Sequence, residues 1–384
     1  MADAAEALAT QMTAWRRELH AHPEFGFSET RTSAFVAARL RALGLSEVIE
    51  GIGGTGVVGT LDRGAGQRIV GLRADMDCLR IHEQGAHAHR STQEGLMHAC
   101  GHDGHTAMLL GAAALLAADA GFAGTVRFVF QPAEEWGRGA LAMLDDGLLD
   151  RFPIDEIYGV HNMPGVPLGA FETCVGPLMA AEDNFEIVLT GQGGHASRPH
   201  EAREVMVPAC ALVVALQTIV SRSVDPADAT VVSVTELMTD GTRNALPGHV
   251  RILGDCRSFR PEVSAGIEAA MRRIAEGVAA AHGVDCEVSY TREFIPLINP
   301  AEQTAAALSA ASKVFPQGAI RGDRAPITAS EDFARLLERV PGCFAFLGNG
   351  TSAPLHSPTY DFDDRLLPLG ARWFAQIARD RTGG

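Results

Sequence analysis

Ligand-type side chains are concentrated in one short segment of the sequence, residues 97–105. The segment contains three histidines, one cysteine and one aspartate. Imidazole and thiolate are preferred ligands of Zn²⁺ and similar ions. Two glycines let the backbone turn tightly, so that Cys100 and His102 can converge. The apolar stretch that follows, residues 106–116, predicts a buried helix. The segment is therefore predicted to be a metal-binding loop at a helix N-terminus.

Two carboxylates follow an apolar stretch upstream of this segment. Residues 69–74 have the composition of a strand, and Asp75 and Asp77 come at its end. Side chains two residues apart in extended chain lie on the same face. Ligands of α/β sheets usually bind at the carboxyl ends of strands, so this pair is a candidate for the site. The alternative is that these aspartates form a turn or cap a helix.

Two further apolar stretches end on ligand-type residues. Residues 128–131 lead into Glu134 and Glu135, and residues 157–160 lead into His161. Neighbouring residues in extended chain point in opposite directions, so we expect the two glutamates to have different roles. One would bind metal, and the other would face the substrate. The alternative for Glu134 and Glu135 is a solvated pair on the surface, and the alternative for His161 is a structural role.

The strand ends, the loop and His356 of the C-terminal part together supply five candidate ligands, more than one tetrahedral zinc ion needs. This predicts two metal ions that share ligands or a bridging water. Thiolate and imidazole disfavour Mg²⁺ and Ca²⁺. A different interpretation makes Cys100 a nucleophile activated by His102 or His105. The candidate ligands are Cys100, His102, Glu134 or Glu135, His161 and His356.

Composition limits the compartments and partners that the sequence favours. The 384 residues include 32 basic and 47 acidic side chains, which gives a net charge of −15. No basic run offers a surface for nucleic acid or for an anionic membrane. Residues 1–17 lack the apolar core of a signal peptide, and the seven cysteines are scattered, so we expect a cytoplasmic protein. The apolar run at residues 205–220 is interrupted by Pro208 and Gln217 and is predicted to be a packed helix.

The order of the predicted elements indicates an α/β protein with two domains. Strand-like and helical stretches alternate in the first part of the chain, as is typical of an α/β sheet. From about residue 182 to residue 291 the pattern becomes βαββαβ, the order of a ferredoxin-like unit. We therefore expect a discontinuous catalytic domain at 1–181 and 292–384, with an inserted domain at 182–291.

The chain resembles the M20 metallopeptidase superfamily over nearly its whole length. The similarity is greatest to the amidohydrolase branch, which includes hippurate hydrolases, indole-acetyl amino acid hydrolases and N-acyl-L-amino acid amidohydrolases. Eight motifs occur in the family's order. They are residues 17–24, 73–77, 97–105, 130–135, 161–164, 191–196, 330–333 and 355–362.

The resemblance implies a central mixed sheet that carries the metal site, with the βαββαβ unit as a lid and dimerisation domain. It also implies that Glu134 is the general base and acid and that Asp77 orients a ligand. Zn²⁺ or Mn²⁺ are the first choices for the two divalent ions, and Co²⁺ or Ni²⁺ are alternatives. The metal ligands that it implies are Cys100, His102, Glu135, His161 and His356.

The resemblance also assigns roles within the lid. His195 would stabilise the developing oxyanion in the active site of a partner subunit, and Asn244 and Arg257 would contact the substrate. A homodimer or tetramer formed through the lid is therefore expected. The sequence departs from the family at residues 78–80, where Cys-Leu-Arg replaces a frequent Ala-Leu-Pro. Arg80 could thus influence substrate preference.

The predicted reaction is hydrolysis of the amide bond of an N-acyl amino acid, a small-molecule substrate, which releases a carboxylic acid and a free amino acid. A dipeptidase or carboxypeptidase using the same two-metal centre is the alternative enzyme. A metal-dependent binding protein without catalytic activity is the alternative from another class. The adjacent Glu134 and Glu135 argue against this last interpretation, because a binding protein has no need of a general base.

Overall fold

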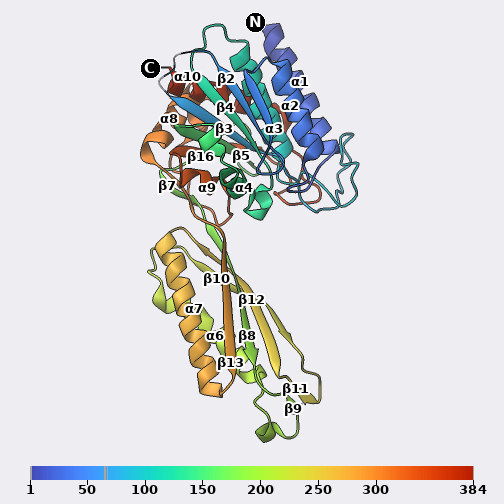
Figure 1. The fold of residues 1–384 in the computed structure, drawn as a ribbon, viewed down its shortest axis with the longest axis vertical. Helices are drawn as coiled ribbons and strands as arrows, with labels where there is room; N and C mark the ends of the chain where they lie inside the picture. Colours follow the sequence, from blue (N-terminus) through green and yellow to red (C-terminus); the bar gives the residue numbers. More distant parts are fainter. Residues whose placement is uncertain (1, 65, 67, 384) are drawn as a thin grey trace. The chain divides into compact units, whose positions relative to one another are not determined.

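The computed structural model describes residues 2–64, 66 and 68–383, which form two compact units (Figure 1). The first unit comprises Met1–Leu178, Ile298–Ala325 and Asp332–Gly384, and the second comprises Met179–Leu297 and Pro326–Glu331. The junctions lie close to the predicted ones at 181/182 and 291/292. The segment Pro326–Glu331, however, belongs to the second unit. Backbone hydrogen bonds from Ala180 N to Ile327 O (3.2 Å) and Ala329 O (2.9 Å) hold it there.

A mixed eight-stranded sheet forms the centre of the first unit, in the order β1-β2-β4-β3-β5-β16-β6-β15. β3 is parallel to β4 and to β5, and β5 is parallel to β16. The predicted α/β class is confirmed. The strands are β1 (Glu47–Ile52), β2 (Gly56–Asp62), β3 (Ile69–Asp75), β4 (Thr125–Gln131), β5 (Glu156–Met163), β6 (Phe171–Glu172), β15 (Ile320–Arg321) and β16 (Gly342–Gly348).

Helices pack on both faces of this sheet. Leu72 and Ala74 of β3 lie in the same apolar core as α3 and α10. Arg73, on the opposite face by the two-residue period, lies over the ring of Phe333 in α9. The helices of this unit are α1 (Ala2–Ala21), α2 (Thr30–Ala42), α3 (His102–Ala117), α4 (Gly139–Asp145), α5 (Leu148–Arg151), α8 (Ala301–Ser312), α9 (Phe333–Leu337) and α10 (Leu367–Thr382), with the 3-10 helices η1 (Glu134–Trp136), η4 (Gln317–Ala319) and η5 (Asp364–Leu366).

Parallel pairing brings several strand ends to one edge of the sheet. The last residue of β3, Asp75, pairs with Gln131, the last residue of β4. β5 is the other parallel neighbour of β3 and carries His161 close to its own carboxyl end. The N-terminal part of α3 lies against the same edge, because Thr106 Oγ1 donates to the Asp75 carbonyl (2.8 Å). The predicted convergence of these strand ends is confirmed.

The second unit has the predicted βαββαβ order. Its antiparallel sheet has the order β10-β12-β8-β13, and successive residues of β8 alternate between buried and more exposed positions. The elements are β8 (Ala181–Thr190), β9 (Gly194–His195), η2 (Pro199–Glu201), α6 (Met206–Thr218), the π-helix η3 (Ile219–Ser223), β10 (Val231–Thr239), β11 (Ala245–Leu246), β12 (His249–Ser258), α7 (Pro261–His282) and β13 (Asp285–Phe294), while β7 (Gly176–Met179) and β14 (Leu297–Asn299) lie where the chain passes between the units.

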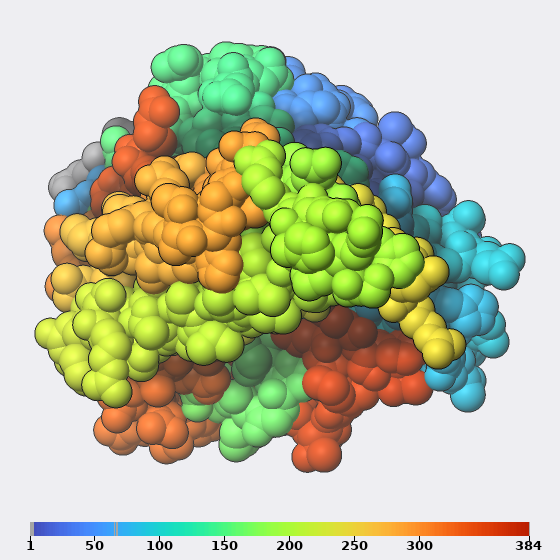
Figure 2. All heavy atoms as spheres, turned by 90° about the horizontal axis from the view of Figure 1, so that it is seen from below, coloured from blue at the N-terminus to red at the C-terminus, as the bar shows by residue number. Residues whose placement is uncertain are grey.

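The helix α6 is buried on one face only. Leu212 and Leu216 pack in the core of the second unit, whereas Val207 and Val214 are 58% and 71% exposed. With η3, the helix is long and apolar enough to span a membrane by length and composition alone, and 28% of that stretch is buried. Figure 2 shows atoms of the second unit, yellow-green to orange, at the surface. The predicted packing of residues 205–220 is thus correct for one face of the helix.

Candidate metal centre

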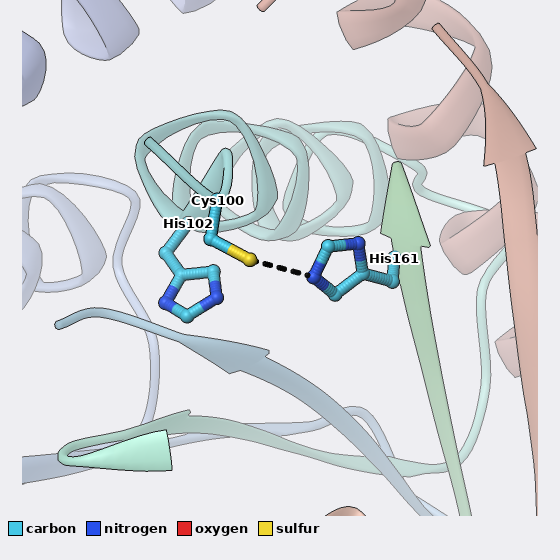
Figure 3. A group of neighbouring side chains, drawn as sticks. All are labelled: Cys100, His102 and His161. Carbon is cyan, nitrogen blue, oxygen red and sulfur yellow. Dashed lines mark hydrogen bonds between the residues drawn. The ribbon is translucent and has the colours of Figure 1, made fainter. Parts of the chain in front are cut away.

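The loop before α3 places Cys100 against the end of β5. Gly101 precedes the helix with a φ of 93°, a conformation that residues with a side chain rarely adopt. A Cβ at this position would lie 2.2 Å from Asn162 Oδ1, so the close approach of the loop to β5 requires glycine. Cys100 Sγ consequently lies 3.3 Å from His161 Nε2. In Figure 3, the sulfur lies between the rings of His102 and His161.

His102 is oriented by Asp77. Its Nδ1 lies 3.0 Å from the Asp77 carbonyl oxygen and 3.1 Å from Asp77 Oδ1. The ring is fully buried, and its Nε2 has no hydrogen-bond partner among the residues that the structure describes. A buried nitrogen without a partner is costly, whereas metal-binding histidines commonly have their other nitrogen held by a carboxylate or carbonyl. The contacts of His102 therefore fit a metal ligand.

Glu135 and His356 form the other side of the group. Glu135 N donates to Asp77 Oδ2 at 3.1 Å, and Glu135 Oε1 lies 3.3 Å from His356 Nε2. His356 N donates to the Ala99 carbonyl at 2.8 Å, which connects the C-terminal segment to the loop of Cys100. Asp77 thus contacts His102 with one carboxylate oxygen and the Glu135 backbone with the other.

The structure brings all five predicted ligands together in two overlapping groups. Cys100, His102 and His161 form one group, and Cys100, Glu135 and His356 form the other. Within each group, the potential ligand atoms lie within 4.8 Å of one another. The shared cysteine, the unpartnered His102 Nε2 and the mixed S, N and O donor set fit two neighbouring ions of the zinc type.

Burial and charge shift the pKa values of these groups in different directions. Burial, together with Glu135 and Glu134, holds the pKa of Cys100 well above its usual value. Burial would lower the pKa of His102, but Asp75 and Asp77 raise it to about 10. Burial, reinforced by His105, holds the pKa of His161 well below its ordinary value. The thiol and His102 therefore carry protons at neutral pH that a metal ion must displace.

The two glutamates do not point in opposite directions as predicted. Ala133 has a φ of 48°, and the 3-10 helix η1 then begins at Glu134, so the backbone here is not extended. Glu134 Oε2 and Glu135 Oε1 lie 3.9 and 4.0 Å from the same atom, His102 Nε2. Both carboxylates therefore face the candidate centre. Glu135 belongs to a group of potential ligands with Cys100 and His356, which separates it from Glu134.

A chain of buried polar groups that includes Asp75 and His105 supports the centre, and the sequence did not predict that these two side chains contact each other. His105 Nδ1 lies 2.6 Å from Asp75 Oδ1, and its Nε2 lies 2.7 Å from Asn162 Oδ1. Asp75 Oδ2 accepts a hydrogen bond from Arg73 at 2.7 Å. The strand-end position of Asp75 and the three-residue helical spacing between His102 and His105 were the available signals.

The predicted lid residues lie in the second unit. His195 pairs with Ala245 across β9 and β11, and Ala196 N donates to the Asn244 carbonyl at 3.0 Å, so His195 and Asn244 are near neighbours. Arg257 makes ion pairs with Glu182 (2.7 Å) and Asp255 (2.9 Å). Its guanidinium is thus already held by two carboxylates of its own unit. The catalytic and substrate-binding roles of these residues stay predictions.

Arg80 lies in the first unit, in the segment that departs from the family pattern. Its guanidinium stacks over the ring of Phe25, 4.1 Å from the ring centroid. Both side chains line a cavity of about 430 Å³ together with Glu24 and Arg31. An influence of Arg80 on substrate preference stays a prediction.

The chain is similar to metal-dependent hydrolases along nearly its whole length. Residues 71–380 match the family described as peptidase family M20/M25/M40. Hippurate hydrolase of Campylobacter jejuni is 38% identical over 363 residues, 94% of each chain. N-acetylcysteine deacetylase of Bacillus subtilis is 35% identical over 383 residues, 98% of each chain. The crystal structure of a dinuclear metal-binding peptidase of the M20 family from Bacillus subtilis has a TM-score of 0.86 at 32% identity and covers 98% of both chains.

Proposed function

The chain belongs to peptidase family M20/M25/M40, and we propose that it hydrolyses the amide bond of N-acyl amino acids with the help of two divalent metal ions. The observation that carries this proposal is the convergence of five ligand-type side chains beside two carboxylates that face the same atom. Relatives named hippurate hydrolase and N-acetylcysteine deacetylase, which align over almost the entire chain, support this substrate class. The products would be a carboxylic acid and a free amino acid.

The two groups that share Cys100 would hold the ions, and Zn²⁺ or Mn²⁺ suit their donor atoms best. When bound, divalent ions in such a centre lower the pKa of a water molecule and polarise a carbonyl oxygen. Glu134 would take a proton from the attacking water and return it to the departing amine nitrogen. Asp77 would keep both His102 and Glu135 in position through the contacts that it already makes with them.

The roles of three second-unit residues are also proposals. His195 would donate to the oxyanion in the active site of a partner subunit, and Asn244 would contact the substrate. Arg257 would bind the carboxylate of the amino acid product, because a guanidinium forms two parallel hydrogen bonds with such a group. Glu182 and Asp255 hold that guanidinium in this structure, so substrate binding would have to displace at least one of these contacts.

We propose that the protein forms a homodimer or tetramer through its second unit. The exposed apolar side chains of α6 support this proposal, because water contact with such a surface is unfavourable. Val207 and Val214 are the most exposed of them. All seven cysteines are free, which supports a location in the reducing cytoplasm. Size-exclusion chromatography with light scattering of wild type and Val214→Glu would test the assembly, and dissociation of the variant is the expected result.

Dipeptidase or carboxypeptidase activity is the second candidate function, because the dinuclear relative of known structure is described as a peptidase. Both activities use the same chemistry and differ only in the acyl side of the substrate. A hydrolysis panel separates them. N-acetyl, N-benzoyl and indole-acetyl amino acids are compared with dipeptides, each with defined added metal. We expect the highest kcat/KM for an N-acyl amino acid, and a preference for dipeptides would overturn the proposal.

A further inference from the structure

A second cluster of histidines and carboxylates lies in the first unit and uses none of the five predicted ligands of the centre. Its members are His20 of α1 and Glu83 and His87 of the loop between β3 and α3. The nitrogen and oxygen atoms that these side chains offer lie within 4.8 Å of one another. The loop is tied to the end of α1 by the hydrogen bond from Thr92 N to the Ala21 carbonyl, 2.9 Å.

His20 is held in a fixed orientation. Its ring is fully buried, and its Nδ1 lies 2.8 Å from Asp103 Oδ2. Its Nε2 then faces Glu83 Oε1 at 3.3 Å. A histidine whose Nδ1 donates to a carboxylate presents the lone pair of Nε2, which is the arrangement usual for metal-binding histidines. Two lone pairs that face each other across 3.3 Å are favourable only with a proton or a cation between them.

Glu83 is also held in a fixed orientation. Its Oε2 accepts a hydrogen bond from Ser91 N at 2.6 Å, which leaves Oε1 directed toward the two histidines. His87 Nε2 lies 2.7 Å from Oε1, yet this buried nitrogen has no hydrogen-bond partner among the described residues. The contact is therefore close without being aligned as a hydrogen bond. A cation bound beside both atoms would satisfy the nitrogen.

The separation of His20 and Glu83 suits two ligands of a small transition-metal ion, whereas His87 Nε2, at 2.7 Å from Glu83 Oε1, would move slightly away from this oxygen when the ion binds. Two ligands of a tetrahedral zinc ion lie about 3.3 Å apart, since each is about 2.0 Å from the metal. The distance from His20 Nε2 to Glu83 Oε1 has this value. Gly85 allows Glu83 and His87 to approach each other. A Cβ at this position would lie 2.6 Å from His87 Cε1 and 3.1 Å from Glu83 Oε1.

The charges around the cluster also favour a cation. The Arg16 guanidinium contacts three carboxylates, those of Asp103 (3.5 Å), Asp361 (2.9 Å) and Asp364 (2.7 Å). Glu83 adds a fourth negative charge to this region. Arg17, which contacts Asp364, is the other arginine in this network. Negative charge therefore remains to be neutralised.

His89 lies next to the cluster but is not one of its ligands. Its ring stacks on that of His87 with 4.2 Å between the centroids. Its Nε2, however, lies 3.0 Å from Arg16 Nη2 and 3.1 Å from Asp361 Oδ1, so the guanidinium and this carboxylate already contact it. A nitrogen that faces a guanidinium is a poor metal ligand.

We propose that His20, Glu83 and His87 bind one divalent transition-metal ion, with Zn²⁺ as the first choice, and that this ion fastens the loop of residues 81–92 onto α1. Water would complete the coordination, because three protein ligands leave one position of a tetrahedral ion open. Two imidazoles and one carboxylate favour Zn²⁺ over Mg²⁺ or Ca²⁺. This third site is separate from the two-metal centre and has no thiolate ligand.

Metal analysis of the full-length protein tests this proposal. Wild type, His87→Ala and His82→Ala are dialysed against buffered Zn²⁺, and zinc per chain is measured by mass spectrometry. His82 is exposed, lies in the same loop and is outside the cluster, so His82→Ala is the matched control. We expect His87→Ala to bind about one zinc ion per chain less than the other two proteins. Equal zinc content in all three would overturn the proposal and leave a protonated His20 paired with Glu83.

Two further measurements keep the result unambiguous. Glu83→Gln preserves the size of the side chain and its contact with Ser91, and it is expected to lose the same ion even if His87→Ala folds poorly. Replacement of zinc by Co²⁺ monitors the two-metal centre separately, because only Cys100 there gives a thiolate-to-cobalt absorption band. The band should be unchanged in both variants. A weaker band together with the missing ion would place the loss in the two-metal centre and overturn the proposal.

Discussion

Replacement of Glu134 by glutamine should abolish most of the turnover while leaving the metal ions in place. Glu134 is 6% exposed, and its Oε2 lies 3.9 Å from His102 Nε2, a distance longer than a hydrogen bond. Glutamine has the same shape and cannot accept the proton. A positioned general base contributes roughly 10²–10⁴ in rate. At about 1.36 kcal/mol for each factor of ten, the barrier should rise by about 2.7–5.4 kcal/mol.

The assay measures kcat and KM for N-acetyl and N-benzoyl amino acids, together with metal content, on the same preparations. Glu135→Gln is the matched control, because the neighbouring glutamate is a predicted ligand and its Oε1 lies 3.3 Å from His356 Nε2. We expect Glu134→Gln to retain its metal and lose kcat, and Glu135→Gln to lose metal. A Glu134→Gln enzyme with near-normal kcat, or one that has lost its metal, would refute the division of roles.

Three other predictions concern the same chemistry. Asp77→Asn weakens the contact that orients His102 and should lower metal affinity by about 10–100-fold, measured by competition with a chelator; unchanged affinity would show that Asp77 does not position the ligands. His195→Ala should lower kcat more than it raises KM, whereas a change in KM alone would make His195 a binding residue. Metal loading at pH 7–8 should release about two protons, because the pKa of Cys100 lies well above its usual value and that of His102 is about 10. Affinity should therefore rise as the pH increases toward 10, and calorimetry in buffers of different ionisation enthalpy counts the protons; release of none would contradict these pKa shifts.

The convergence of the strand ends was predictable because parallel strands share one edge of a sheet. Asp75, Gln131 and His161 follow from this rule, since each stands at or near the end of an apolar stretch. The directions of the two glutamates were not predictable in the same way. They depend on the left-handed conformation of Ala133, and alanine carries no sequence signal for such a turn.

Contacts between distant parts of the chain were also hidden from the sequence. The segment Pro326–Glu331 packs with the second unit through backbone hydrogen bonds, which any residue type can form. The pairing of Arg257 with Glu182 joins residues of two neighbouring strands, β12 and β8, and their register became known only from the fold. His20 and Glu83 meet for the same reason, since α1 and the loop are far apart along the chain.

Removal and restoration of the metal ions tests whether hydrolysis depends on the two-metal centre. Protein stripped by a chelator and then dialysed is assayed for kcat/KM with the best N-acyl amino acid, before and after addition of Zn²⁺ or Mn²⁺. We expect a loss of at least about 100-fold, since metal activation of water supplies several kcal/mol, and recovery on adding the ions. Metal-free protein that hydrolyses the substrate at the original rate would contradict this expectation.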